Sequence, residues 1–297
     1  MELELKRGGR TARVETLGGE LVSYRDERGL EYIWGGDPAY WPGRNPLLFP
    51  IVGMLKEGKI RFDGREYAME RHGFARRREF TPAARGEDWV RLELRESAET
   101  LALYPYSFRL AVEQRLTDTG FSTAVTVANP GEGPLPFCLG AHTGFRCPLE
   151  AGERFEDYEL VFPERESCPT LLLRDGLLDR PAALPCLEDT DTLPLDYRWF
   201  DALDTLIFEG LRSRSVTLRS RKSGRGVRVS FDGFPMLAFW TMPGKKAPYL
   251  CIEPWHGCAA GTAEGPEFTD KAHCIVLAPG ESRTACPTLS KRYTKSR

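Results

Sequence analysis

Signatures of nucleotide and metal binding are missing from this sequence. No GxGxxG turn follows a strand pattern, no GxxxxGKS/T loop occurs, and no two cysteines form a CxxC pair. Such motifs cradle phosphates on backbone N–H groups or hold zinc, so their absence argues against a nucleotide-dependent enzyme and a zinc module. His256 and Cys258 are close enough in sequence to share a metal, but a zinc site needs about four ligands and no second pair accompanies them. We therefore expect neither a cofactor nor a metal.

Long apolar runs are also lacking. The run around Leu47 to Leu55 is far shorter than the roughly 20 residues that span a bilayer. The N-terminus, MELELKRGGR, lacks the basic-then-apolar order of a signal peptide. We therefore expect a cytoplasmic protein with no membrane partner. Its eight cysteines are then expected to be reduced thiols, most of them small buried side chains.

An excess of positive charge is absent as well. The formal net charge is -2, and no basic stripe is interleaved with aromatic residues, so we expect no nucleic-acid partner. The short basic run Arg76-Arg77-Arg78 is interpreted as a solvated turn or strand edge in preference to a phosphate site.

Helical periodicity is scarce, whereas strand patterns recur along the whole chain. Glu96 to Leu103 has room for one or two helical turns before Pro105. A hairpin is predicted within Lys59 to Met69, turning at Asp63-Gly64. Strands are predicted over Trp89–Leu94, Ser107–Leu116, Phe121–Val127, Val216–Leu218, Gly226–Phe231, Met236–Trp240, Tyr249–Glu253 and Cys274–Leu277. The predicted fold class is therefore all-β, a sandwich or a barrel.

The stretch from Ser167 to Asp196 interrupts this pattern. It is rich in Pro, Asp, Leu and Arg and has little two-residue alternation. We expect it to be a long loop over the sandwich, not a linker, and we therefore predict a single domain over residues 1–297.

Few residues are suited to acid–base chemistry. Of the four histidines, three lie beside glycine in short polar motifs: RHGF at His72, GAHTGF at His142 and EPWHG at His256. Histidine titrates near neutral pH, and glycine lets a ligand approach closely, although a single histidine is more often structural than catalytic. Glu253 follows the apolar run from Tyr249, so it ends a strand, where it points into a cleft or forms a rim salt bridge.

Two tryptophans are candidates for contacting a ring-shaped ligand. Trp240 and Trp255 each offer a flat apolar face to a sugar ring, or else pack in the core.

Several segments, taken in order, resemble the aldose 1-epimerase (galactose mutarotase) family, and its LacX-like branch in particular. They are NPLLFP at Asn45–Pro50 with Gly53, RHGF at Arg71–Phe74, GAHTGF at Gly140–Phe145, Phe200–Phe208, CIEPWHG at Cys251–Gly257 and LAPGES at Leu277–Ser282. The resemblance covers nearly the whole chain and depends on the order and spacing of segments that are not unique singly. It implies a galactose mutarotase-like β-supersandwich with a cleft on one sheet face.

The resemblance also implies roles for individual residues. Glu253 matches the family's general base and His142 its general acid. The matching substrate-binding positions are His72, Arg44 and Asp204, with Asp201 as a competitor for Asp204, and Trp255 joins them as a candidate ring contact. The branch usually has His-Pro in the acid segment, whereas this chain has His142-Thr143, so its local turn differs.

The implied function is interconversion of the α and β anomers of a free hexose such as galactose or glucose, because one carboxylate and one imidazole suffice for that reaction. The partner is then a small sugar, and the protein is a monomer or a homodimer. Two alternatives stay open: a hexose-6-phosphate 1-epimerase, for which Arg71, Arg76 or Arg77 are candidate phosphate ligands, and a non-catalytic carbohydrate-binding protein. With Arg44 as the single placed arginine, we expect little gain from a 6-phosphate.

Overall fold

The computed structural model describes residues 1–293, so the last four residues of the predicted 1–297 domain lie outside the described residues. The strands are β1 (Glu2–Arg7), β2 (Arg10–Glu15), β3 (Glu20–Arg25), β4 (Leu47–Leu48), β5 (Lys59–Phe62), β6 (Arg65–Ala68), β7 (Thr81–Arg85), β8 (Trp89–Arg95), β9 (Arg109–Leu116), β10 (Gly120–Ala128), β11 (Leu135–Phe137), β12 (Leu139–Ala141), β13 (Thr143–Arg146), β14 (Tyr158–Arg174), β15 (Leu177–Pro194), β16 (Thr205–Glu209), β17 (Ser215–Ser220), β18 (Arg225–Ser230), β19 (Met236–Trp240), β20 (Tyr249–His256), β21 (Ile275–Leu277), β22 (Ser282–Ala285) and β23 (Thr288–Tyr293). The helices are α1 (Ala98–Leu101) and α2 (Tyr197–Leu203), with 3-10 turns at Lys56–Gly58, Ala75–Arg77, Phe155–Asp157 and Phe268–Asp270.

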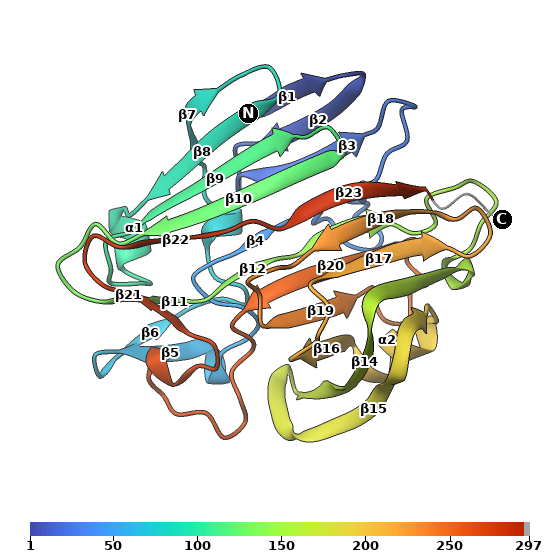
Figure 1. Ribbon diagram of the computed structural model, residues 1–297. Coiled ribbons are helices and arrows are strands. Elements are labelled where there is room, and N and C mark those ends of the chain that lie inside the picture. Colours follow the sequence, from blue (N-terminus) through green and yellow to red (C-terminus); the bar gives the residue numbers. More distant parts are fainter. Residues whose placement is uncertain (294–297) are drawn as a thin grey trace.

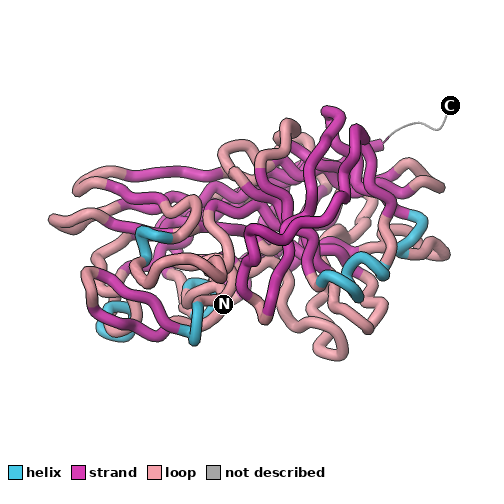
Figure 2. The backbone as a smooth tube through the Cα atoms, turned by 90° about the horizontal axis from the view of Figure 1, so that it is seen from below, coloured by secondary structure: helices cyan, strands magenta, loops and turns pink. Residues whose placement is uncertain are grey.

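One large antiparallel sheet organises the described chain (Figure 1). Its strands follow the order β4-β12-β20-β19-β16-β14-β17-β18-β23-β10-β9-β8-β7, with β13 also pairing β20, β15 pairing β14 and β22 pairing β10. A three-stranded sheet β1-β2-β3 and the pairs β5-β6 and β11-β21 accompany it. Seen from below, the strands form a broad band, and the short helical segments lie toward its periphery (Figure 2). The fold is therefore β-rich, as the sequence predicts.

The predicted strands form because their apolar residues alternate. In β8, Val90, Leu92 and Leu94 are buried while the residues between them are partly exposed. The predicted hairpin at Asp63-Gly64 is confirmed as β5–β6, and both turn residues have positive φ, which glycine adopts without strain. The predicted helical turns are confirmed as α1, which Ser97 and Thr100 cap reciprocally.

The prediction of a long loop over residues 167–196 is wrong. Most of this stretch forms the hairpin β14–β15, which turns at Asp175-Gly176 and lies beside α2 (Figure 1). Four register shifts interrupt the pairing, between Val161 and Leu172. Each shift resets which face the next side chain points to, so the two-residue alternation is lost from the sequence although the strands are present.

The cysteines are unpaired and the helices are short. All eight cysteines are free thiols, and five of them are buried. The longer α-helix, α2, has seven residues. Within residues 1–293, no helix is both long and apolar enough to cross a membrane.

Candidate active site

A cleft of about 890 Å³ opens over strands β19 and β20. Such a volume is typical of sites that enclose a small molecule. The cleft is bordered by the β14–β15 hairpin, by α2 and by the loops that carry Trp41 and His72. Its charged or titratable lining side chains, cysteine aside, are Arg71, His72, Arg76, His142, Asp175, Asp201, Asp204 and Glu253. Most of the predicted catalytic and substrate-binding residues therefore line this cleft.

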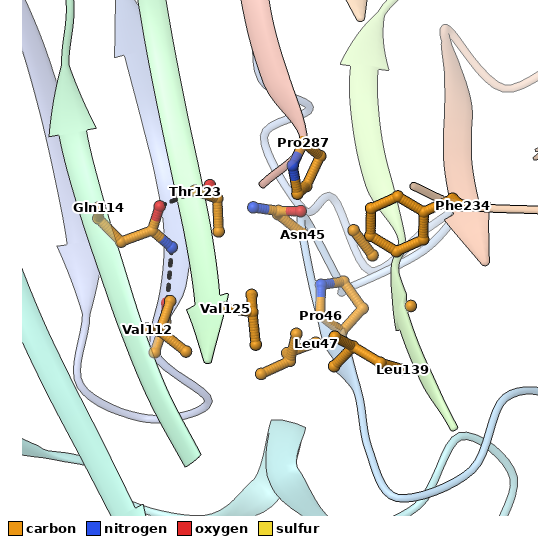
Figure 3. Close-up of a pocket in the computed structure, with 13 residues that line it drawn as sticks. Asn45, Pro46, Leu47, Val112, Gln114, Thr123, Val125, Leu139, Phe234 and Pro287 are labelled. Carbon is orange, nitrogen blue, oxygen red and sulfur yellow. Dashed lines mark hydrogen bonds between the residues drawn. The ribbon is translucent and has the colours of Figure 1, made fainter. Parts of the chain in front are cut away.

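A second cavity, drawn in Figure 3, is much smaller and offers no acid or base. Its volume is about 20 Å³, which holds about one water molecule. The Gln114 amide in its wall donates to the Gly19 carbonyl and accepts from the Thr123 hydroxyl. The amide of Gln114 is thus already satisfied, and the cavity is too small for a sugar, so we regard it as a packing feature.

Strand β20 forms the floor of the large cleft. It pairs with β19 along one edge and with β12 and β13 along the other. Glu253, in the middle of β20, is only 1% exposed. The indole N–H of Trp255, two residues later on the same face, donates to the Glu253 carboxylate at 3.3 Å. The predicted ring contact Trp255 therefore also fixes the predicted base.

His142 lies in the short gap between β12 and β13, opposite the same strand. Its Nε2 atom is 3.4 Å from Oε1 of Glu253. The gap places the imidazole in the cleft because both flanking strands are fixed to β20. The structure thus brings the predicted acid and the predicted base into direct proximity.

Burial disfavours charge on both members of this pair. It raises the pKa of Glu253 well above its usual range, and nearby Asp204 acts in the same direction, while the Trp255 bond opposes them. Burial lowers the pKa of His142 to about 3, and the charges of Arg76 and Arg71 add to that effect. A neutral carboxyl with a neutral imidazole holds the same single proton as a carboxylate with an imidazolium, so the pair titrates as a unit.

Aromatic rings orient the His142 imidazole. The Trp41 ring stacks on it with centroids 4.8 Å apart, and the Trp240 ring meets it edge-on at 5.6 Å. Within the described residues its Nδ1 atom has no hydrogen-bond partner, so packing and not a third polar group sets its orientation. Trp41 was not among the predicted site residues, because it lies in an irregular loop with no periodic pattern.

His72 reaches the cleft from a turn with positive φ. Its Nδ1 atom accepts the backbone N–H of Gly53 at 3.1 Å. Its ring lies edge-on to His142, with centroids 5.6 Å apart. Burial lowers the pKa of His72 well below its usual value, so this histidine is neutral and presents its remaining ring N–H to the cleft.

Asp204 and Asp201, the two predicted alternatives, both line the cleft. The Asp201 carboxylate accepts the backbone N–H of Gly244 at 2.7 Å. The Asp204 carboxylate, at the end of α2, accepts the Thr205 hydroxyl at 2.8 Å. Asp204 is also the carboxylate whose charge acts on Glu253.

Arg44 is the predicted site residue that the structure keeps out of the cleft. Its guanidinium donates to the Gly35 carbonyl at 3.2 Å and lies 3.5 Å from Glu15. Its backbone N–H donates to the Glu20 carboxylate at 3.0 Å, which fixes this segment to β3. The arginines that line the cleft are Arg71 and Arg76, so the interpretation of Arg76 as part of a solvated turn is corrected as well.

Potential metal-ligand atoms of three residues lie together at the floor of the cleft, which His142 and Glu253 line and Cys251 does not. The donor atoms of His142, Cys251 and Glu253 are all within 4.8 Å of one another. A catalytic zinc takes three protein ligands, but a cysteine must lose its proton to bind it. Burial raises the pKa of the Cys251 thiol well above its usual value, which favours the protonated form that does not bind metal.

Comparison with known proteins identifies relatives along the full length of the chain. The family model described as aldose 1-epimerase matches residues 1–290. The plasmid form of protein LacX from Lactococcus lactis subsp. lactis is 42% identical over 287 residues, covering 94% of this chain and 95% of that protein.

Solved structures give the same answer. A galactose mutarotase related enzyme from Lactobacillus acidophilus has a TM-score of 0.94 at 27% identity, covering 99% of this chain and 98% of that one. A galactose mutarotase-like protein from Lactobacillus casei ATCC 334 has a TM-score of 0.92 at 26% identity, covering 98% and 100%. The predicted galactose mutarotase-like fold is confirmed, and the chain belongs to the aldose 1-epimerase family.

Proposed function

We propose that this protein is an aldose 1-epimerase, an isomerase that interconverts the α and β anomers of a hexose. The observation that carries this proposal is the buried pair formed by His142 and Glu253, with Nε2 and Oε1 3.4 Å apart on the floor of a small-molecule cleft. Pairs of titratable groups whose environments shift their pKa values mark acid–base sites.

The pair supplies both proton transfers of the reaction. In its carboxylate–imidazolium form, Glu253 takes the proton from the O1 hydroxyl while His142 protonates the ring oxygen, so the C1–ring-oxygen bond breaks and an aldehyde forms. Rotation about the C1–C2 bond presents the other face of the aldehyde. The ring oxygen then attacks that face, His142 takes back its proton, and Glu253 returns its proton to O1. No electron or group is transferred, and the pair ends as it began.

The other cleft residues hold the sugar. We assign to Asp204 the role of accepting sugar hydroxyls, in preference to Asp201, because Asp204 is the carboxylate whose charge acts on Glu253. His72 donates to a sugar oxygen from its free ring N–H. Trp240 and Trp41 provide apolar faces beside the reacting centre. The reaction requires a free hydroxyl at C1 and makes no demand on the substituent at C6.

A non-catalytic carbohydrate-binding protein is the rival from another class. Such a protein needs the aromatic faces and the hydrogen-bonding groups but not a buried acid–base pair. Burying an ionisable carboxyl opposes folding unless the group is compensated, so a Glu253 that is 1% exposed is better explained by catalysis. A glycoside hydrolase needs a pair of carboxyl groups flanking the scissile bond, and the group facing Glu253 is an imidazole.

Anomer exchange measured by NMR over a panel of hexoses tests the proposal. We expect exchange that rises linearly with protein concentration above the uncatalysed rate for at least one hexose. If no hexose exchanges faster while the protein still binds sugars in a calorimeter, the epimerase is excluded and the binding protein is supported.

A further inference from the structure

Charge is distributed unevenly around the acid–base pair. The carboxylate of Asp204 acts on Glu253, the group that handles O1. Arg71 precedes His72, whose ring lies edge-on to His142 with centroids 5.6 Å apart, and Arg76 donates to the Arg71 carbonyl, so both guanidinium groups line the cleft on the His142 side. The cleft therefore has an acidic side next to the base and a basic side next to the acid.

The two arginines on the basic side have no anionic partner. The chain carries four arginines close together here, and those that face away from the cleft are paired: Arg77 with Glu70 and Arg78 with Glu99. Within residues 1–293, no ion pair joins Arg71 or Arg76 to a carboxylate, not even to Asp175 on the hairpin turn that borders the same cleft.

The contacts that these arginines do make leave donors free. Arg76 donates from Nη2 to the Arg71 carbonyl at 2.8 Å, and within the described residues its buried Nε has no partner. Arg71 contacts the sulfur of Met54 at 2.6 Å through Nη2. A half-buried guanidinium without a counter-ion opposes folding, and burial accordingly lowers the pKa of Arg76. A ligand that carries negative charge would compensate the two guanidinium groups, as expected for an anion-binding site.

Sugar geometry indicates where that charge is carried. The ring oxygen is bonded to C1 and C5, and C6 is attached to C5. A hexose whose ring oxygen faces His142 therefore directs C6 to the ring-oxygen side, where Arg71 and Arg76 stand. Guanidinium groups bind phosphate and carboxylate in a planar, paired geometry.

We propose that Arg71 and Arg76 bind an anionic substituent at C6, so that the substrates are hexose 6-phosphates or hexuronates. The inference rests on the proposed epimerase function and specifies its substrate class. It replaces the expectation of little gain from a 6-phosphate, which depended on Arg44 as the single placed arginine. The hairpin supports it, because a Cβ on Gly176 would lie 3.3 Å from Nη2 of Arg71, so the turn closes this end of the cleft.

Anomer exchange of matched sugars tests the proposal. Glucose and galactose are compared with their 6-phosphates and with glucuronate and galacturonate, each corrected for its uncatalysed rate. We expect kcat/KM to be about tenfold or more higher for an anionic sugar than for its neutral parent, as for hydrogen bonds to charged groups. A preference for the phosphates or for the uronates identifies which anion is the natural one.

Substitutions separate the anion site from the reaction. Arg71→Gln and Arg76→Gln are expected to lower kcat/KM for the anionic sugar about tenfold to a hundredfold more than for its neutral parent. Arg76→Lys, which keeps the charge, should retain more activity than Arg76→Gln. Arg77→Gln is the matched control, because Arg77 is exposed, pairs with Glu70 and lies outside the cleft, and it should alter neither substrate.

The proposal is overturned if neutral sugars exchange as fast as anionic ones, or if both arginine variants slow the two classes equally. Calorimetry with a hexose 6-phosphate distinguishes this failure from failure of the proposed function. If no sugar exchanges but the phosphosugar binds and Arg76→Gln abolishes binding, the epimerase is wrong and the anion site stands. If neither the phosphosugar nor a hexuronate binds the wild-type protein, the anion site is wrong.

Discussion

Strand β20 and the hairpin β14–β15 border the same cleft and are built in opposite ways. β20 is paired along both edges, and its residues from Tyr249 to Trp255 are all buried. The hairpin carries four register shifts, and its turn region is largely exposed or half-buried. Its tip is fixed by backbone bonds between Leu178 and the segment at Ala260 and Thr262.

This difference separates two tasks. The atoms proposed to exchange protons must be held to about half an ångström. Glu253 lies on the strand that the sheet fixes on both sides, and His142 lies between two strands that pair with it. The hairpin residues that line the far end of the cleft lie on an irregular element, which can vary without disturbing the sheet. Changes on β20 should therefore affect the rate of the chemical step, and changes on the hairpin should affect binding.

The largest effect is expected at the reacting pair. Glu253→Gln keeps the size of the side chain but cannot accept a proton, so kcat should fall by at least about a hundredfold. KM should change little, because the lost interaction belongs to the transition state. His142→Asn should behave similarly, and the double variant should be less impaired than the product of the single ones, because the pair acts as a unit.

His256→Asn is the matched control for these variants, because His256 ends the same strand outside the cleft. Its exchange rate should stay close to that of the wild-type protein. Near-normal rates in both Glu253→Gln and His142→Asn would show that the pair is not catalytic.

A smaller effect, on binding, is expected at the hairpin turn. Gly176 has φ of 78°, and a Cβ there would lie 2.5 Å from the Met54 sulfur. Gly176→Ala should displace the turn from the Arg71 end of the cleft, raising KM severalfold with little change in kcat. Gly152→Ala is the control, since Gly152 has φ of 80° but open space around its Cβ position. Equal changes in both variants would mean that backbone strain, and not the cleft contact, is responsible.

The buried pair should also make the free energy of unfolding depend on pH. The folded protein holds the Glu253 proton above the ordinary pKa of 4.5, so the wild-type fold loses stability as pH rises from 4.5 through the raised pKa. Each unit of raised pKa corresponds to ~1.4 kcal/mol. Glu253→Gln cannot ionise, so its Tm should exceed that of the wild type at pH 8, with a difference that shrinks toward pH 4.5. Thermal melts across this range measure it, and a difference independent of pH would contradict the burial argument.

The smallest effect is expected from removing metal. The acid–base pair accounts for the reaction by itself, so exhaustive chelation and Cys251→Ser should both leave the exchange rate nearly unchanged. Activity that is lost on chelation and restored by zinc would instead place a metal between His142, Cys251 and Glu253.

The contrast between β20 and the hairpin β14–β15 also explains which parts of the fold were predictable from the sequence. β19 and β20 were predictable because each is an uninterrupted apolar run, as in strands that are buried on both faces. The predicted end at Glu253 was wrong, because β20 continues through Pro254 to His256. The hairpin was not predictable, because its register shifts erase the alternation. Arg44 and Arg76 show a second limit: both lie in turns between strands, and sequence spacing does not say which way such a turn directs a guanidinium. Trp41 shows a third limit: an aromatic residue in a loop belongs to no periodic pattern, so the sequence does not indicate that it lines the cleft.

The backbone bond from Gly53 to His72 has a consequence for the direction of hydrogen bonding in the cleft. Because Nδ1 accepts that bond, the neutral ring carries its one proton on Nε2. His72 therefore offers the ligand a donor and no acceptor, and any atom placed opposite must bring a lone pair. A hydroxyl, an ether or a fluorine substituent meets this demand, whereas a protonated amine does not. Comparing a hexose with its amino and fluoro counterparts at each position would therefore locate the sugar carbon that faces His72.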